Sequence, residues 1–188
     1  MREYHCPKVT EILMAAPLRL GLAGLGTVGI GVVKIVQEHA ALITARTGRE
    51  VVITAVSARD RTKNRDVDLS GYSWETDPVA LARRDDIDVF VEVMGGSEGA
   101  ARDATEAALA AGKDVVTANK ALLAHHGQAL AQTAEAAGCV IRFEAAVAGG
   151  IPVVKALTEG LAANRIRRII GVMNGTCNYI LTRMEDAG

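Results

Sequence analysis

The stretch that decides the fold is LRLGLAGLGTVG, residues 18–29. Its apolar first half, residues 18–23, predicts a short buried strand, and apolar residues at helical spacing predict a helix from Val28 to about Thr47. Between the two lies Gly24-x-Gly26-x-x-Gly29. Gly24 permits a tight turn, Gly26 lets a ligand approach the backbone, and Gly29 lets the helix pack closely on the strand.

A glycine turn in this position is typical of dinucleotide-binding proteins. The helix amino terminus offers free N–H groups and a partial positive charge to a diphosphate. We therefore take the whole turn as a candidate cofactor site: Gly24, Leu25, Gly26, Thr27, Val28 and Gly29. The alternative is a glycine-rich connection with no ligand.

The rest of the chain continues the alternation of strands and helices. Further strands are predicted at residues 51–56, 88–93, 114–118, 140–144 and 165–173, and further helices at 78–84, 98–111, 120–138, 152–162 and from Thr176 onward. Residues 57–73 are polar and predict an exposed loop. Because parallel strands need such crossovers, we expect a Rossmann-type, doubly wound parallel α/β sheet.

The domain organisation follows from this pattern. We expect an extension at residues 1–17, a nucleotide-binding domain at 18–151, and the start of an α+β substrate or dimerisation domain at 152–188. A strand at 165–173 would need a neighbour that does not follow it, so we expect the natural protein to be longer. Either Met1 or Met14 could be the natural start.

Composition excludes several classes of protein. The 188 residues are 49% hydrophobic and carry a net charge of −1, with no basic arm for nucleic acid and no membrane-spanning run. The three cysteines, Cys6, Cys139 and Cys177, form no metal-binding pair, and His125-His126 lacks the spacing of a metal site. We expect a cytoplasmic protein that binds neither nucleic acid nor membrane, with the two histidines on its surface and Cys177 either buried or inert.

The end of the second predicted strand bears on the choice of cofactor. Arg59 comes first there and would pair with the 2′-phosphate of NADP, and Arg61 and Lys63 add positive charge. Asp60 could instead accept hydrogen bonds from the ribose hydroxyls of NAD. NADP is favoured and NAD stays open, as does a loop that is charged for solubility alone.

Four segments together resemble the homoserine dehydrogenase family. They are the glycine turn at 24–29, VTANK at 116–120, EAAVAGGIP at 144–152 and GVMNGTCNYIL at 171–181. Their order and spacing match as well as the segments themselves, and the resemblance covers residues 18–188.

The resemblance implies the NAD(P)H-dependent interconversion of aspartate 4-semialdehyde and homoserine, on the route to threonine, methionine and isoleucine. Lys120, at the end of the fourth strand, would lie between nicotinamide and substrate and polarise or protonate the substrate oxygen. A surface lysine that begins a helix is the alternative. A second lysine and acidic substrate-binding residues of the family would follow residue 188, so we expect this chain to be inactive alone.

The resemblance also implies three further sites. Gly95, with Gly96, would line the nicotinamide ribose. A sodium ion would be held by Glu144 and the carbonyls of Val147, Gly149 and Ile151, although Glu144 could simply cap nearby N–H groups. Asn174, Gly175 and Thr176 would form a wall of the substrate pocket; the alternative is a turn and a helix cap.

Two other functions stay open. One is a dinucleotide-binding module without activity, and the other is a different small-molecule reductase, such as a dihydrodipicolinate reductase or a semialdehyde dehydrogenase. The acylating semialdehyde dehydrogenases need a nucleophilic cysteine beside a base, which is missing here. We also expect exposed apolar residues of the second domain to form a homodimer or higher homo-oligomer: Val153, Leu157, Leu161, Ile169 and Ile170.

Overall fold

The computed structural model describes residues 15–171 and 175–187. Its contacts divide the chain into two units, Met1–Phe143 and Glu144–Gly188. We describe each unit by itself.

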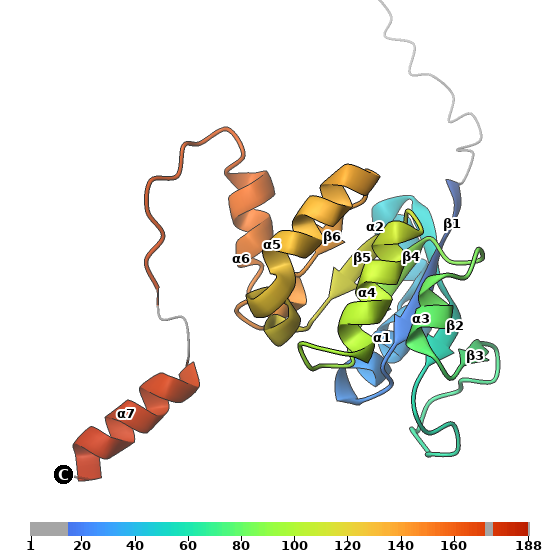
Figure 1. Cartoon of the computed structure of the whole chain (residues 1–188), viewed down its shortest axis with the longest axis horizontal. Coiled ribbons are helices and arrows are strands. Elements are labelled where there is room, and N and C mark those ends of the chain that lie inside the picture. Colours follow the sequence, from blue (N-terminus) through green and yellow to red (C-terminus); the bar gives the residue numbers. More distant parts are fainter. Residues whose placement is uncertain (1–14, 172–174, 188) are drawn as a thin grey trace, which may run out of the picture. The chain divides into compact units, whose positions relative to one another are not determined.

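The first unit is built on a six-stranded sheet (Figure 1). Its strands are β1 (Ala15–Ala23), β2 (Arg49–Ser57), β3 (Ser73–Glu75), β4 (Val89–Glu92), β5 (Asp114–Thr117) and β6 (Ile141–Arg142). The spatial order is β3-β2-β1-β4-β5-β6, and every neighbouring pair is parallel. This confirms the predicted Rossmann-type sheet. The order reverses between β1 and β4, and at such a point the carboxyl ends of the strands open a crevice for a ligand.

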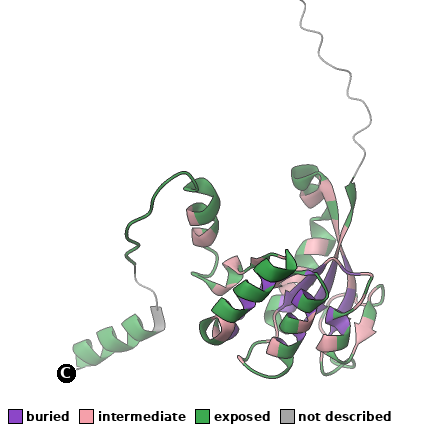
Figure 2. Ribbon diagram, turned by 45° about the horizontal axis from the view of Figure 1, so that its top comes forward, coloured by how far each residue is buried: buried purple, intermediate pink, exposed green. Residues whose placement is uncertain are grey.

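Helices cover both faces of the sheet. On one face, α1 (Thr27–Glu38) packs its buried Val33 against Leu22 and Val56, and α2 (Ala40–Thr47) follows it. On the other face, Phe90 packs under the helices α3 (Pro78–Ala82), α4 (Ala100–Ala110) and α5 (Lys120–Ala137). Figure 2 shows the buried residues gathered in the strands and on the sides of these helices. Asp77 caps α3, accepting a hydrogen bond from Val79 N at 2.9 Å.

Three elements of this unit differ from the prediction. The single helix predicted to end near Thr47 is broken at His39 into α1 and α2, which meet at a bend of 77°. The strand β3 was missed, because three residues show no alternation and this edge strand exists only through its pairing with β2. Strand β6 ends at Arg142, so Glu144 is not part of it.

The regular elements described in the second unit are all helical. It contains the 3₁₀ turn η1 (Glu144–Ala146), α6 (Val153–Lys155), the π-helical turn η2 (Ala156–Gly160) and α7 (Gly175–Ala187). The helix predicted at 152–162 is thus present as α6 and η2. Helix α7 begins at Gly175, one residue before the predicted start, so Thr176 lies inside the helix and is not its cap.

The predicted strand at 165–173 is also wrong for its described part. Residues 165–171 are irregular and exposed, and 172 and 173 lie outside the described residues. A strand needs a partner for its backbone N–H and C=O groups. The described part of this unit contains no other strand to provide one.

Among the described helices, none is by itself both long and apolar enough to cross a membrane. Only α1 and α2 taken together meet the criteria of length and composition, and they are sharply bent.

Candidate functional site

The glycine turn connects β1 to α1 at the reversal point of the sheet. Gly24 has a φ of +104°, and its N–H donates a hydrogen bond to Ser57 O at 2.8 Å. A Cβ on Gly24 would lie 2.7 Å from the carbonyl oxygen of Val93, and a Cβ on Gly29 would overlap the carbonyl oxygen of Gly24. Both glycines are therefore required by close packing between the strand ends and the helix.

Gly26 differs from the other two glycines. It is the N-cap of α1 with an ordinary φ of −81°, no side chain caps the helix, and a Cβ there would meet nothing within 4 Å. Its carbonyl accepts the first helical hydrogen bond, from Ile30 N at 2.9 Å. The amides of the first turn, which includes Thr27, have no acceptor within the helix and carry its partial positive charge.

A cavity of about 500 Å³ lies over this turn. It brings together several predicted residues from three loops: Gly24, Leu25, Gly26, Arg59 and Gly95. Asp60, Lys63 and Arg65 also line it, from the loop after β2. Three cationic side chains thus border a cavity whose floor is a helix amino terminus, which is an arrangement suited to a phosphorylated ligand.

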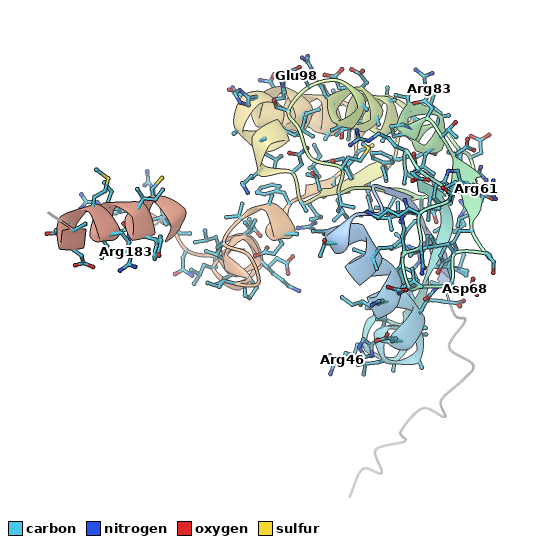
Figure 3. All side chains as sticks on the ribbon, turned by 90° about the horizontal axis from the view of Figure 1, so that it is seen from below. Arg46, Arg61, Asp68, Arg83, Glu98 and Arg183 are labelled. Atoms are coloured by element: carbon cyan, nitrogen blue, oxygen red, sulfur yellow. The ribbon has the colours of Figure 1, made fainter. Side chains whose placement is uncertain are left out.

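Arg65 was missed by the sequence analysis, although it belongs to the same charged loop. Its Nε donates to Leu25 O at 3.2 Å, its Nη1 to Lys63 O at 2.9 Å and its Nη2 to Asp60 O at 2.5 Å. The guanidinium also lies over the ring of Trp74, 5.6 Å from its centroid, and Arg61 lies 5.7 Å from the same centroid. Arg61 is labelled in Figure 3. Arg65 therefore ties the loop to the glycine turn.

Asp60 shapes the same loop. Its Oδ1 accepts hydrogen bonds from Thr62 Oγ1 at 2.7 Å, from Thr62 N at 2.8 Å and from Lys63 N at 3.2 Å. These bonds, led by the one from the Thr62 hydroxyl, lower the pKa of Asp60. The carboxylate thus closes a turn of its own loop, a role that the sequence analysis did not consider.

A second cavity, of about 310 Å³, contains Lys120. Val28, Gly95 and Gly96 line it with Lys120, so Gly95 borders both cavities. Lys120 is exposed at the first position of α5, directly after the N-cap Asn119. Its ammonium can therefore reach a polar ligand in this cavity. The carboxylate of Glu92 is fully buried and does not line this cavity. The sequence analysis missed it, although a charged residue in the apolar strand VFVEV (residues 89–93) was a signal.

The two histidines predicted on the surface differ in exposure: His125 is exposed as expected, whereas His126 is partly buried. His126 Nε2 lies 2.5 Å from Glu98 Oε1, and its side chain is only 18% exposed. Glu98, which is labelled in Figure 3, lines the larger cavity. Its hydrogen bonds to His126 and then Arg102 lower its pKa.

In the second unit, Glu144 caps a helix. Its carboxylate accepts hydrogen bonds from Val154 N at 3.1 Å and Lys155 N at 2.8 Å. This is the geometry of the capping alternative that the sequence left open. Within the described ranges no group of three His, Cys, Asp or Glu side chains could hold a metal ion. The sodium site that includes the carbonyls of Val147, Gly149 and Ile151 stays a prediction.

The predicted substrate-pocket residues belong to the second unit as well. Asn174 lies outside the described residues, and Gly175 and Thr176 form the first turn of α7. Their predicted role is not tested by this geometry.

Comparisons with known proteins agree with this fold. The family model described as "Homoserine dehydrogenase, NAD binding domain" matches residues 24–144, and the model described as "Homoserine dehydrogenase" matches residues 152–188. A homoserine dehydrogenase from Neisseria gonorrhoeae is 46% identical over 172 residues, which are 92% of this chain and 39% of that protein. The chain thus spans about two fifths of the length of this relative.

Two solved structures are similar. The homoserine dehydrogenase from Thiobacillus denitrificans has a TM-score of 0.80 and 45% identity, covering 90% of this chain and 39% of that one. A hyperthermophilic archaeal homoserine dehydrogenase in complex with NADPH has a TM-score of 0.73 and covers 92% of this chain and 57% of that one. At 24% identity, this second structure supports the fold alone.

Proposed function

Because the chain belongs to the homoserine dehydrogenase family, a family of NAD-dependent oxidoreductases, we propose that it is the cofactor-binding part of an enzyme that interconverts aspartate 4-semialdehyde and homoserine. The observation that carries the proposal is the pair of cavities that share Gly95. One lies over the glycine turn and is bordered by cations, and the other contains Lys120. A dinucleotide that spans both would place its diphosphate at α1 and its nicotinamide beside Lys120.

A bound nicotinamide supplies or accepts the hydride in this chemistry. The chain's own residues bind, orient and supply charge. In the reductive direction the aldehyde carbon gains a hydride and its oxygen gains a proton. The Lys120 ammonium is a suitable group to polarise that oxygen or to pass a proton to it, since it is exposed to the second cavity.

We propose that the chain prefers NADP to NAD. Arg59, Lys63 and Arg65 line the larger cavity beside the end of β2, where a 2′-phosphate would lie. Asp60 borders the same cavity, but its Oδ1 already accepts three hydrogen bonds from its own loop.

Calorimetric titration of the chain with NADP⁺ and with NAD⁺ tests both statements. We expect both ligands to bind, NADP⁺ about tenfold more tightly, since one charge-assisted hydrogen bond contributes about 1.5–3 kcal/mol. Equal affinities would remove the preference, and no binding of either would remove the proposal.

A second experiment measures activity. NADP-dependent oxidation of homoserine is assayed in this chain and in a version extended by the remaining length of its relatives. Activity that appears only in the extended version supports the dehydrogenase. Binding without activity in either supports the alternative of a binding module.

Three finer statements belong to the same proposal. Sodium would bind at Glu144 with the carbonyls of Val147, Gly149 and Ile151. The backbone of this segment is irregular, with positive φ angles at Ala148 (55°) and Gly150 (82°). Residues 174–176 would border the substrate. Apolar side chains exposed in the second unit, among them Leu161, Ile169 and Ile170, would form a homodimer.

We also propose a cytoplasmic location. Cys139 forms no disulfide among the described residues, and free cysteines are usual in a reducing compartment. Light scattering tests the dimer: a strict monomer at high concentration would contradict it.

A further inference from the structure

Glu92, the last residue of β4, is a fully buried carboxylate, with 0% of its surface exposed. Burying a charge is costly unless its hydrogen bonds are satisfied. Glu92 Oε1 accepts from Met94 N at 2.8 Å and from Gly95 N at 3.2 Å, and Oε2 accepts from Thr117 Oγ1 at 2.7 Å. All three partners are donors, so both oxygens of the carboxyl group act as acceptors.

The hydrogen bonds continue from Thr117 into the next loop. Thr117, 1% exposed, accepts at its hydroxyl from Asn119 N at 2.9 Å. Asn119 Nδ2 then donates to Gly96 O at 2.6 Å, while its Oδ1 accepts from Leu122 N at 3.1 Å and caps α5. The bonds form a closed ring between the turn after β4 and the junction of β5 with α5.

This ring of hydrogen bonds fixes the backbone of Gly95 and Gly96, which could otherwise adopt many conformations. Gly95 and Gly96 have φ angles of +83° and +88°, and no atom lies within 4 Å of a Cβ built on either. Two successive glycines can adopt many conformations, so side-chain packing does not define their position. The hydrogen bonds from Glu92 and Asn119 do, and Lys120 follows Asn119 directly.

We propose that Glu92 and Thr117 are positioning residues, which hold the turn at Gly95–Gly96 at a set distance from Lys120 so that a nicotinamide ring is clamped between them. This rests on the proposed function. Neither side chain lines the two cavities, so both act through the backbone of other residues. A preformed site of this kind binds more tightly because less backbone must be ordered on binding.

The test separates the nicotinamide end of the ligand from the rest. Thr117→Val keeps the shape of the side chain but removes the donor to Glu92 and the acceptor for Asn119 N. We measure binding of NADP⁺ and of 2′-phospho-ADP-ribose, which lacks the nicotinamide. We expect NADP⁺ to bind about tenfold more weakly, as for one lost buried hydrogen bond, and 2′-phospho-ADP-ribose to bind as in the wild type.

The matched control is Thr105→Val. Thr105 is also a fully buried threonine, but its hydroxyl donates to Ala101 O at 2.8 Å within α4. We expect Thr105→Val to lower the melting temperature about as much as Thr117→Val does, but to cause no selective loss of NADP⁺ binding. Thr117→Ser keeps the hydroxyl, so its affinity for NADP⁺ should be close to that of the wild type. The fluorescence anisotropy of bound NADPH, which reports on the dihydronicotinamide ring, should fall in Thr117→Val alone.

Should Thr117→Val fail to fold, Glu92→Gln is measured in the same way. Its amide, turned toward Thr117, leaves the threonine proton without an acceptor, so the same selective loss is expected. Equal losses for both ligands, or no loss, would overturn the inference. So would a wild-type chain that binds both ligands equally well, because then nothing holds the nicotinamide. Binding of neither ligand to the wild type would instead refute the proposed function.

Discussion

Replacing Gly26 with alanine should separate cofactor binding from stability. The added methyl would meet no atom within 4 Å, and the φ of −81° suits alanine. Alanine is a poorer N-cap than glycine, which lowers the free energy of unfolding by about 0.5–1 kcal/mol. It also reduces the conformational freedom of the unfolded chain, which raises the free energy of unfolding by about 0.4–1 kcal/mol. The free energy of unfolding should therefore change by less than about 1 kcal/mol.

Binding should respond quite differently. The methyl would stand in the cavity that Gly26 lines, where a diphosphate would approach the amides of α1. Each charge-assisted hydrogen bond that is lost costs about 1.5–3 kcal/mol, which is about tenfold to more than a hundredfold in affinity. Calorimetry with NADP⁺ measures this loss, and thermal unfolding without ligand measures stability.

Gly31→Ala is the control for this experiment. Gly31 lies inside α1, and a Cβ there also meets nothing within 4 Å. In a helix interior alanine should stabilise the protein by about 0.5–1 kcal/mol, with no effect on binding. If Gly26→Ala binds NADP⁺ as tightly as the wild type, the diphosphate does not lie over this turn and our interpretation of the cavity is wrong.

Three more predictions follow from individual contacts. Arg65→Leu should reduce the affinity for NADP⁺ more than that for NAD⁺, because it removes a cation from the larger cavity; equal losses in calorimetry would show that Arg65 only supports the loop. Acid should destabilise the protein as Asp88 is protonated: its hydrogen bonds from Arg19 lower its pKa to about 2. A depressed folded-state pKa means that this stabilisation is complete above the unfolded-state value near 4 and is lost as the pH falls toward 2. Unfolding midpoints of Asp88→Asn should therefore depend less on pH over that range, and an unchanged slope would contradict the assignment. Finally, sodium chloride should raise the melting temperature relative to choline chloride at equal ionic strength, and Glu144→Gln should abolish the difference; identical curves for the wild type in both salts would remove the sodium site.

Much of the fold was predictable because its signals are local. The strand, glycine turn and helix at residues 18–29 follow from steric limits on a few neighbouring residues, and the parallel sheet follows from the alternation of elements. The roles of Gly24 and Gly29 were confirmed by close packing. The capping role of Asp77 was likewise predictable, since its partner is two residues away.

The sequence alone thus determined the sheet, the glycine turn and the position of Lys120 at a strand end, because these depend on short-range geometry and periodicity. Only the tertiary structure decided which distant side chains complete the site. Arg65 donates a hydrogen bond to Leu25, which lies 40 residues away in the chain, and Thr117 donates one to Glu92, which lies 25 residues away. No local pattern encodes such pairs, since they form only when neighbouring strands bring their carboxyl ends together. The irregular segment at 165–171 also depends on tertiary structure. Strand propensity alone does not make a strand there, because the described part of its unit provides no neighbouring strand to pair with.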